Sequence, residues 1–390
     1  MENNNDNKVL NVPHLRFPEF SEEWEICKVS ELLDFYSTNS LSWEQLEYGT
    51  KAMMNLHYGL IHVGLPTMVD LTRDNLPNIK EDNMPKNFEL CKEGDVAFAD
   101  ASEDTNEVAK PIEFFDLAGK NIVCGLHTIH GRDNKNKTVI GFKGYAFSSS
   151  AFHNQIRRIA QGTKIYSIST KNFSECFIGI PSKVEQTKIA TLLRLIDERI
   201  ATQNKIIEKL QSLIKGIAQN IVLRNKPNVR ISQCLECCSS TLQESDVLEY
   251  GTYPVYGANG VVGFLDNYNT SNEAIYIIKD GSGVGAVSYV AGKCSATGTL
   301  NILQAKKGFS LRYLYYLLNI FNFEPYKTGM AIPHIYFKDY GKAQIFCPSY
   351  SEQLKYAKFL ATIDDKLLTE QNVLINLSLQ KQYLLRQMFI

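Results

Sequence analysis

Gly281-Ser-Gly-Val-Gly is the stretch of this chain that looks most like a phosphate-binding loop. A dinucleotide-binding loop follows a strand and opens a helix, because the helix N-terminus and the backbone N–H groups hold the phosphates. Here the apolar runs 275–279 and 286–290 predict a strand on each side. The loop is therefore expected to be a hairpin turn, with a nucleotide site as the alternative. The chain lacks the P-loop pattern and the Asn-Pro-Pro-Tyr or Asp-Pro-Pro-Tyr segment with which amino-methyltransferases hold a flipped base.

Cysteine and histidine spacing gives little support for a metal site. Cys234, Cys237 and Cys238 form a C-x-x-C-C sequence, which is half of a zinc-binding pattern. A second pair is missing, because Cys294 and His334 lie far along the chain. The other histidines of interest also lack a metal-binding or acid–base spacing: His57, His62, His127 and His130. We therefore expect packing roles for these residues and no metal.

Two similar loops, each preceding a long helical stretch, are the best candidates for contact with a ligand. Gln161-Gly-Thr-Lys-Ile-Tyr-Ser-Ile and Thr328-Gly-Met-Ala-Ile-Pro-His-Ile keep their Gly and Ile positions, while the intervening side chains differ. A shared scaffold with altered side chains suits two related modules that read different things. The predicted contacts are Thr163, Lys164, Tyr166 and Ser167 in the first loop and Met330, Ala331 and His334 in the second. The acidic segment 97–104, AFADASED, is expected to be a polar turn or helix cap, with a DNA-facing loop as the alternative.

Composition limits the class of protein. The 390 residues, 44% of them hydrophobic and 21% charged, predict two or three globular domains. A formal net charge of −1 argues against binding to nucleic acid through bulk positive charge, but it leaves room for local basic faces. Nine scattered cysteines favour free thiols in a reducing compartment. The polar leader 1–8 and the absence of an 18-residue apolar run predict a cytoplasmic protein without a membrane span.

A long helix from 181 to 223 must position these loops. Its apolar residues recur at alternating spacings of four and three, which is the seam of a coiled coil. The seam consists of Ile189, Leu193, Ile196, Ile200, Gln203, Ile207, Leu210, Ile214, Ile217 and Ile221. In an antiparallel pair, a buried polar rung such as Gln203 can fix the register at some cost in stability.

The same helix occurs a second time, 167 residues further on. Its seam reads Tyr356, Leu360, Ile363, Leu367, Glu370, Leu374, Leu377, Lys381, Leu384 and Met388. Fifteen of the 41 positions from 162 to 202 are identical to their partners without a gap. In addition, Glu47-Tyr-Gly-Thr recurs at Glu249, at an offset of 202. The chain is thus a tandem duplication of a globular region followed by a helix, and such units usually bury a shared seam against each other.

Each globular region is expected to be mixed helix and strand. In the first, strands are predicted at 59–63, 95–99, 121–124 and 139–142, with a helix near 151–159. In the second, strands are predicted at 261–265, 274–279, 286–290 and 300–304, with a helix at 312–321.

This arrangement resembles the DNA specificity subunit of type I restriction-modification enzymes across essentially the whole chain. The residues that carry the resemblance are PHLRFPEFSEEW near the start, the helix openings IPSKVEQTKIATLLRLIDERI and CPSYSEQLKYAKFLATIDDKL, and YPVYGANGVVGF with KDGSGVGAVSYVAGKCSATGTLNI. The resemblance implies two target-recognition domains, each reading one half of a bipartite asymmetric DNA sequence. The helices would set the spacing and dock modification subunits. The second globular region departs from the pattern in lacking an equivalent of Trp24.

The predicted fold class is α+β. Two mixed α/β target-recognition domains are separated by two long antiparallel helices that form a coiled coil, as a pseudo-two-fold tandem repeat. The expected boundaries are target-recognition domain 1 at 1–180, a central spacer helix at 181–224, target-recognition domain 2 at 225–347 and a C-terminal spacer helix at 348–390. A helix of about 40 residues is about 60 Å long, enough to hold two domains on major-groove segments a turn or so apart.

The resemblance also implies partners and contacts. The chain would be a non-catalytic subunit that binds double-stranded DNA, two modification (methyltransferase) subunits and, through the complex, restriction (endonuclease/translocase) subunits. It would hold no cofactor itself, because S-adenosylmethionine belongs to the modification subunit and ATP with Mg to the restriction subunit. Further DNA contacts are expected at Lys110, Arg132, Lys279, Ser282 and Lys293, and partner contacts at Ile189, Leu193, Ile196, Tyr356, Leu360 and Ile363. The alternatives are a self-contained S-adenosylmethionine-dependent methyltransferase and a coiled-coil scaffold that binds only proteins.

Overall fold

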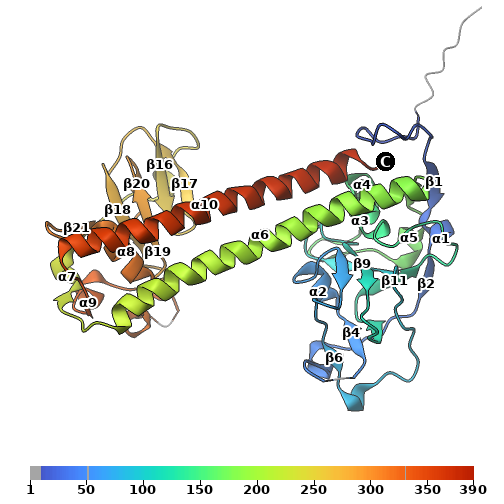
Figure 1. The fold of residues 1–390 in the computed structure, drawn as a ribbon, viewed down its shortest axis with the longest axis horizontal. Helices are drawn as coiled ribbons and strands as arrows, with labels where there is room; N and C mark the ends of the chain where they lie inside the picture. The colour runs from blue at the N-terminus through green and yellow to red at the C-terminus, as the bar shows by residue number, and fades with distance from the viewer. Residues whose placement is uncertain (1–9, 51, 330) are drawn as a thin grey trace, which may run out of the picture. The chain divides into compact units, whose positions relative to one another are not determined.

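The computed structural model describes residues 10–50, 52–329 and 331–390. The polar leader 1–8 lies outside the described residues. Internal contacts divide the chain into two units, each of which contains one globular region and part of both long helices (Figure 1). Unit 1 comprises the described residues up to Thr202 together with Leu374–Ile390, and unit 2 comprises those of Gln203–Val373.

The two predicted long helices are present as α6 (Lys183–Leu223) and α10 (Tyr350–Gln387). Each begins just after a serine that bonds to the first turn. The Ser182 hydroxyl accepts a hydrogen bond from the Glu185 N–H (3.4 Å), and the Ser349 hydroxyl donates one to the Glu352 carboxylate (2.6 Å). Among the described helices, none contains a stretch apolar enough to cross a membrane.

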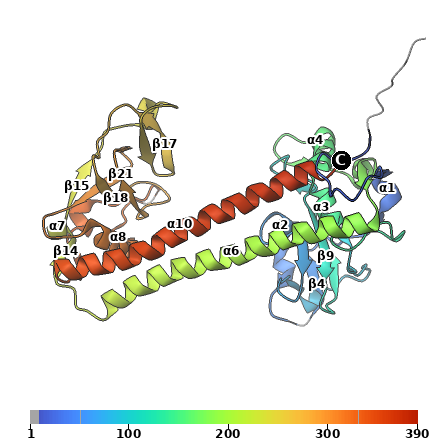
Figure 2. The same ribbon diagram turned by 45° about the horizontal axis from the view of Figure 1, so that its top comes forward.

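In unit 1, α6 and α10 run antiparallel and close a common core (Figures 1 and 2). Ile189, Leu193 and Ile196 of α6 are buried in one cluster with Leu384 and Met388 of α10. Later in α6, the Asp197 carboxylate forms an ion pair with the Lys381 ammonium group (2.6 Å). The start of α6 therefore lies beside the end of α10, as expected for antiparallel helices.

The two ends of unit 1 are also joined directly. The Leu15 N–H donates a hydrogen bond to the carbonyl of Gln387 (2.9 Å), and the Trp24 ring meets the Phe389 ring edge to face with centroids 6.3 Å apart. Trp24 and Phe389 are both buried in the unit 1 core. The residues just after α10 are thus part of the first globular region.

In unit 2, the remaining parts of α6 and α10 are again antiparallel. The predicted polar rungs meet, because the Gln203 amide donates a hydrogen bond to the Glu370 carbonyl (3.0 Å) and another to its carboxylate. Ile221, further along α6, shares a core with Ala357, which lies near the start of α10. Every predicted seam position on both helices is buried or half-buried, whereas apolar residues off the seam, such as Leu195 and Leu368, are more than half exposed. The predicted α+β fold with antiparallel helices is confirmed.

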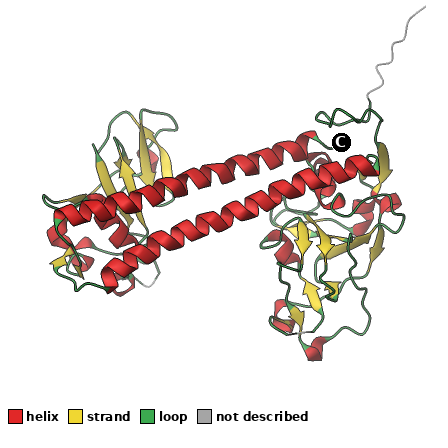
Figure 3. Cartoon of the chain, in the orientation of Figure 1, coloured by secondary structure: helices red, strands yellow, loops and turns green. Residues whose placement is uncertain are grey.

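The globular part of unit 1 is built from small sheets and short helices (Figure 3). Its elements are β1 (Glu25–Lys28), α1 (Val29–Leu32), β2 (Asp34–Tyr36), β3 (Leu46–Glu47), β4 (Met54–Leu56), α2 (Tyr58–His62), β5 (Met68–Asp70), β6 (Asn78–Ile79), β7 (Val96–Ala99), β8 (Ala101–Ser102), β9 (Pro111–Asp116), β10 (Ile122–Cys124), β11 (Thr128–Arg132), α3 (Lys143–Phe147), α4 (Ser150–Ile159), β12 (Tyr166–Ser167), α5 (Thr170–Ser174) and β13 (Phe177–Ile180). Single-turn 3₁₀ helices occur at Trp43–Gln45 and Glu81–Asn83. The sheets have the strand orders β1-β13, β10-β4-β6-β3, β2-β11-β7-β9-β5 and β12-β8.

The globular part of unit 2 is richer in long strands. Its elements are β14 (Val229–Arg230), α7 (Ile231–Cys234), β15 (Leu235–Ser239), β16 (Tyr253–Gly257), β17 (Gly260–Leu265), β18 (Glu273–Ile278), β19 (Val287–Ala291), β20 (Ser295–Ala296), β21 (Leu300–Ala305), α8 (Leu311–Asn319), α9 (Phe337–Tyr340) and β22 (Gln344–Ile345). Single-turn 3₁₀ helices occur at Glu244–Asp246 and Glu324–Tyr326. The sheet orders are β14-β22, β15-β21-β18-β19 and β17-β16-β20. All four predicted strands and the predicted helix of this region are present.

Two predicted strands of the first region are wrong. Residues 59–63 lie largely in helix α2, whose first turn is capped by the His57 ring, since its Nδ1 accepts from the Gly59 N–H (3.1 Å). Residues 139–142 form a turn before α3. The fully buried Glu113 carboxylate accepts hydrogen bonds from the N–H groups of Gly141 (2.9 Å) and Gly144 (2.8 Å), so a distant carboxylate holds this segment out of an extended conformation.

The duplication is visible in matching hydrogen bonds at the two helix starts. In α6, the buried Gln186 amide accepts from the Val139 N–H (2.9 Å) and donates to the Pro181 carbonyl (2.9 Å). In α10, Gln353 accepts from the Ser310 N–H (2.9 Å) and donates to the Pro348 carbonyl (2.9 Å). Each glutamine thus joins its helix to its own globular region through backbone groups.

Replacing either glutamine with leucine should destabilise its own unit. Gln186→Leu or Gln353→Leu leaves buried backbone groups without a partner, at a cost of about 1–3 kcal/mol. Hydrogen–deuterium exchange by mass spectrometry should show faster exchange near residues 183–202 for the first variant and near 350–373 for the second. Gln219→Leu is the control, because Gln219 is exposed on α6 and the expected change is within about 0.5 kcal/mol. Equal exchange in all three variants would contradict the assignment.

Candidate nucleic-acid interface

The first candidate loop, residues 161–167, is closed by its own backbone and lies against the acidic segment. Gln161 and Ser167 exchange two N–H to carbonyl hydrogen bonds of 3.0 and 2.8 Å. Strand β12 at the end of the loop pairs with β8, and the Ile168 N–H donates to the Asp100 carbonyl (2.9 Å). The structure therefore brings the predicted loop beside residues 100–102, but the prediction of a polar turn or helix cap at 97–104 is wrong for most of that segment, because residues 96–99 and 101–102 form the strands β7 and β8.

The second candidate loop, residues 328–334, repeats this geometry in unit 2. Thr328 and His334 exchange two backbone hydrogen bonds of 2.9 and 2.8 Å. The Ile335 N–H donates to the Lys279 carbonyl (2.9 Å), and the Gly281 N–H donates to the Pro333 carbonyl (3.0 Å). The glycine-rich stretch 281–285 connects antiparallel strands β18 and β19, so the predicted hairpin is confirmed and lies beside the second loop.

Both loops require glycine at their second position. Gly162 has φ +139° and Gly329 has φ +92°, which are conformations that L side chains rarely adopt. A Cβ atom would lie 1.9 Å from the Ile165 carbonyl oxygen at the first site and 2.3 Å from that of Ile332 at the second. The retained glycines therefore have a backbone cause, and the neighbouring side chains are free to differ between the loops.

Most of the predicted DNA contacts are accessible. The exposed residues are Thr163, Lys164, Ser167, Ser282, Lys293 and Ala331. The half-buried residues are Lys110, Tyr166, Lys279 and His334. Met330 lies outside the described residues.

Two predicted lysines have local partners. The Lys110 ammonium group forms an ion pair with Glu107 (2.7 Å) and donates to the His62 carbonyl (3.1 Å). Lys293 lies over the rings of Tyr268, 4.8 Å from the centroid, and Tyr253, at 5.8 Å. Such basic and aromatic groupings can bind phosphate and stack on bases.

An aromatic and histidine group beside the first loop was missed by the sequence analysis. His127 bonds through Nδ1 to the Asp100 carboxylate (3.1 Å), and its ring lies 5.2 Å from the Tyr58 ring. Trp43, which is 45% exposed, lies 4.5 Å from His57, centroid to centroid. Burial and the neighbouring His127 lower the pKa of His57, so this ring stays neutral near pH 7. These residues are separated by up to 84 positions, and their spacing carried no signal.

Arg132 is not on the accessible surface and does not suit a DNA contact. It is 7% exposed, and its guanidinium forms bidentate hydrogen bonds to the Asp95 carboxylate, both of 2.8 Å. It also donates to the Glu89 carboxylate (2.7 Å) and the Leu90 carbonyl (2.7 Å). Burial opposes ionisation of Asp95, but the hydrogen bonds from His130 and Arg132 outweigh it and lower the pKa of Asp95. The charge of Arg132 therefore pairs with the buried Asp95 carboxylate rather than with a DNA phosphate.

The six seam residues predicted for partner contact are also covered, fully or partly, by other residues of the chain. Ile189, Leu193, Ile196 and Leu360 are buried in the cores, and Tyr356 and Ile363 are half-buried. The helices instead expose other apolar side chains: Val184, Leu195, Ile206 and Leu213 on α6, and Leu354, Phe359, Leu368, Ile375, Leu379 and Tyr383 on α10. A partner that binds the intact helices would meet these residues, because the seam is already occupied.

Known proteins share both the domain and the fold. Residues 228–377 match the type I restriction modification DNA specificity domain. A putative type I specificity subunit from Mycoplasma genitalium is 26% identical over 299 residues, which cover 70% of this chain and 77% of that protein. The specificity subunit of the type I restriction enzyme EcoprrI from Escherichia coli is 25% identical over 126 residues, covering 32% of this chain and 30% of that protein.

Solved structures extend the likeness to nearly the whole chain. The crystal structure of a type I restriction-modification S subunit from M. genitalium covers 97% of this chain and 99% of its own, with a TM-score of 0.62 at 19% identity. Residues 228–377 therefore carry a type I restriction modification DNA specificity domain, and the chain has the fold of the S subunit. A second structure, from work on complex assembly and conformational transition of the type I system, covers 93% of this chain and 96% of its own, with a TM-score of 0.53 at 14% identity.

The matched specificity domain contains the second loop and its hairpin. Residues 228–377 run from β14 through β18, β19 and loop 328–334 into α10. The first loop lies outside this match, but its backbone hydrogen bonds are the same. The equivalence of the two loop sites in this chain therefore rests on geometry.

Arg132→Ala should act on stability, because it leaves the Asp95 carboxylate buried without its charge partner. The expected loss in free energy of unfolding is about 3–5 kcal/mol, measured by urea denaturation. Lys164→Ala is the control, since an exposed lysine should change stability by no more than about 0.5 kcal/mol. Unchanged stability of Arg132→Ala combined with weaker DNA binding would restore Arg132 as a DNA contact.

Proposed function

We propose that this chain is a type I specificity subunit and reads a bipartite asymmetric DNA sequence, with one loop site for each half. The observation that carries the proposal is the equivalence of loops 161–167 and 328–334. Both are closed by the same pair of backbone hydrogen bonds, and each lies against another segment of its own unit: strand β8 in unit 1 and the hairpin turn 281–285 in unit 2. A repeated backbone with different exposed side chains is what two readers of unequal sequences require.

The side chains of the two loops suit different bases. Thr163, Lys164 and Tyr166 supply hydroxyl and ammonium groups, whereas Ala331 supplies a methyl group and His334 a ring nitrogen. In the major groove each base pair presents its own pattern of donors, acceptors and methyl groups, so loops with different groups favour different sequences. Lys279, Ser282 and Lys293 in unit 2, with Lys110 and His127 in unit 1, would extend these contacts to phosphates and sugars.

The chemistry of methyl transfer and cleavage is proposed to belong to the partners. The stretch 281–285 is a turn between two strands and opens no helix, which disfavours a cofactor site there. We therefore assign S-adenosylmethionine to two modification subunits, and ATP with Mg to restriction subunits that join the same complex. The free thiols of all nine cysteines accord with action in the cytoplasm.

Calorimetry with the purified chain should detect no heat from S-adenosylmethionine, and measurable binding would favour the self-contained methyltransferase.

The helices are proposed to set the spacing between half-sites and to dock the modification subunits. Their continuous lengths of 41 and 38 residues correspond to about 60 Å each. The exposed apolar residues off the seam, such as Leu195 and Phe359, offer partner contacts without opening the helix pair. A scaffold that binds only proteins would share these surfaces, but it would have no use for two matched loop sites.

The first loop should control one half of the target. In the assembled complex, Lys164→Ala removes a proposed phosphate contact, so it should weaken binding and reduce the slope of log K against log salt by about 1. Fluorescence anisotropy over a salt series measures both effects. Lys86→Ala, which removes the same charge from another exposed position of unit 1, should leave the slope unchanged. An equal effect of the two variants would count against the loop.

The second loop should control the other half. His334→Gln changes a ring nitrogen to an amide, and a lost base contact costs about 1–3 kcal/mol of discrimination. Methylome sequencing of cells that express the variant with its modification subunits should show relaxed bases in one half-site only. Relaxation in both halves would contradict modular reading.

Removing one heptad from each helix should shorten the spacer of the target. Deleting residues 203–209 and 367–373 preserves the four-and-three pattern on both seams and removes Gln203 together with Glu370. Seven helical residues span about 10 Å, which is about three base pairs of B-DNA. Methylome sequencing should therefore reveal a shorter gap between unchanged half-sites. An unchanged gap in an assembled, active complex would exclude a role of the helices in spacing.

A further inference from the structure

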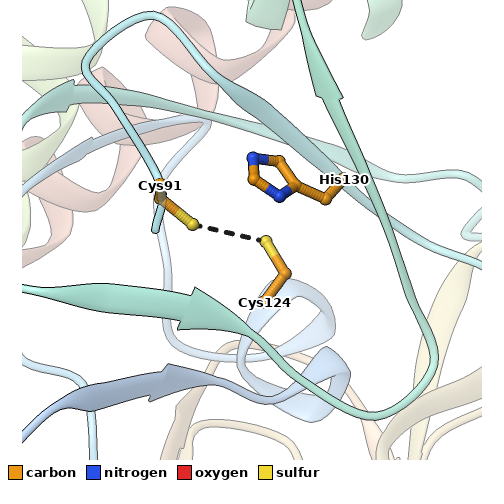
Figure 4. A group of neighbouring side chains, drawn as sticks. All are labelled: Cys91, Cys124 and His130. Atoms are coloured by element: carbon orange, nitrogen blue, oxygen red, sulfur yellow. Dashed lines mark hydrogen bonds between the residues drawn. The ribbon is translucent and has the colours of Figure 1, made fainter. Parts of the chain in front are cut away.

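Three potential metal ligands converge inside unit 1, although they come from three separate segments (Figure 4). Cys91 precedes β7, Cys124 ends β10 and His130 lies in β11. Their ligand atoms all lie within 4.8 Å of one another, and the two sulfur atoms are 3.6 Å apart. Among the described residues, this is the group of three or more His, Cys, Asp or Glu side chains with metal-binding geometry.

The His130 ring is oriented as a metal-binding histidine is. Its Nε2 bonds to the Asp95 carboxylate (2.8 Å), and Asp95 is held in turn by Arg132. Its Nδ1 is buried and has no hydrogen-bond partner among the described residues. Figure 4 shows that this second nitrogen faces the two sulfur atoms. A carboxylate that fixes one ring nitrogen while the other points at thiols is the usual outer support of a histidine ligand.

The ligand atoms lie in a buried, apolar environment, which favours a metal site without net charge. His130 is 0% exposed, Cys124 1% and Cys91 5%, and both sulfurs lie in an apolar cluster with Leu56, Ala97 and Ile122. Two thiolates and a neutral imidazole around a divalent ion carry no net charge, so the complete site is compatible with an apolar interior.

We propose that Cys91, Cys124 and His130 bind one zinc-type divalent cation through two sulfur atoms and His130 Nδ1. Tetrahedral Zn²⁺ with Zn–S bonds of about 2.3 Å places its sulfurs about 3.8 Å apart, close to the separation found here. The widest ligand pair would move together by about 1 Å. Binding releases two thiol protons to solvent, and a water molecule completes four coordination.

Such an ion would link two separate sheets of unit 1. Cys124 belongs to the sheet β10-β4-β6-β3, and His130 belongs to the sheet β2-β11-β7-β9-β5. His127, which bonds to Asp100 beside the first loop, lies between these two ligands in the sequence. The ion would therefore stabilise the surface that carries the first loop, and this inference does not depend on which bases the loop reads.

The test uses Co²⁺ as the probe on the full chain, reduced and freed of metal. We expect one Co²⁺ per chain, with thiolate-to-cobalt charge-transfer absorption, tetrahedral d–d bands in the visible region and loss of both on addition of Zn²⁺. Cys91→Ser and Cys124→Ser should each weaken binding by at least about tenfold. Cys234→Ser is the matched control, because Cys234 and Cys347 form a second buried pair, 3.8 Å between sulfurs, that has no histidine ligand among the residues the structure describes.

The wild-type chain also provides a test that does not depend on variant folding. Zn²⁺ should raise its melting temperature, and circular dichroism of each variant shows whether lost binding accompanies lost structure. Absence of thiolate–cobalt absorption in the reduced wild-type chain would overturn the proposal. So would equal loss of the absorption in Cys234→Ser and Cys124→Ser. Mass spectrometry that finds a Cys91–Cys124 disulfide in the chain as purified, before reduction, would assign the pair to redox chemistry instead.

Discussion

The rest of the structure depends on the burial of one apolar stripe along each long helix. Exposing the ten seam positions of α6 or α10 to water would be unfavourable, because burial of each Leu or Ile side chain contributes about 1.5–3 kcal/mol to the free energy of folding. In unit 1 the stripe packs with the aromatic core of the globular region, and in unit 2 it packs with α8 and its sheet. Both helices therefore contribute residues to the cores of unit 1 and unit 2, in addition to connecting segments of the chain.

The duplication preserved the contacts that attach each globular region to its helices and changed those around them. Gln186 and Gln353 keep the same pair of hydrogen bonds. Asp197 and Asp364 are also equivalent, but the first accepts from the Tyr145 hydroxyl (2.9 Å) and the second from the Tyr316 hydroxyl (3.1 Å) beside Arg312. Burial, helped by the nearby carboxylate, raises the pKa of both tyrosines, so they remain protonated donors. The glutamine and aspartate contacts between each helix and its globular region are thus the same in both repeats, whereas the residues around them differ.

The sequence predicted what is periodic or repeated. The spacing of the seam residues predicted their burial, the shared offset of 167 predicted the equivalence of the two loops, and the apolar runs around Gly281 predicted a hairpin. Each of these features is a period, a repeat or a run in the order of residues, so the sequence alone is enough to reveal it.

Features that depend on distant residues were not predictable in this way. Residues 139–142 looked like a strand, but the buried Glu113 carboxylate holds the following turn. Arg132 looked like a surface cation until Asp95, 37 positions away, accounted for its charge. Cys91 comes from the loop before β7, whereas Cys124 and His130 come from two different sheets, and no spacing in a linear sequence indicates that they meet.

The contacts of Leu15 with Gln387 and of Trp24 with Phe389 have a consequence for biosynthesis. A ribosome makes most of unit 1 first, yet Leu384, Met388 and Phe389 of its core emerge only after all of 203–373 has been translated. Unit 2 has all its residues before unit 1 does, which reverses the usual order in which the N-terminal part of a nascent chain matures first. Until then the nascent first half lacks Phe389, whose ring packs on both Trp24 and Phe142.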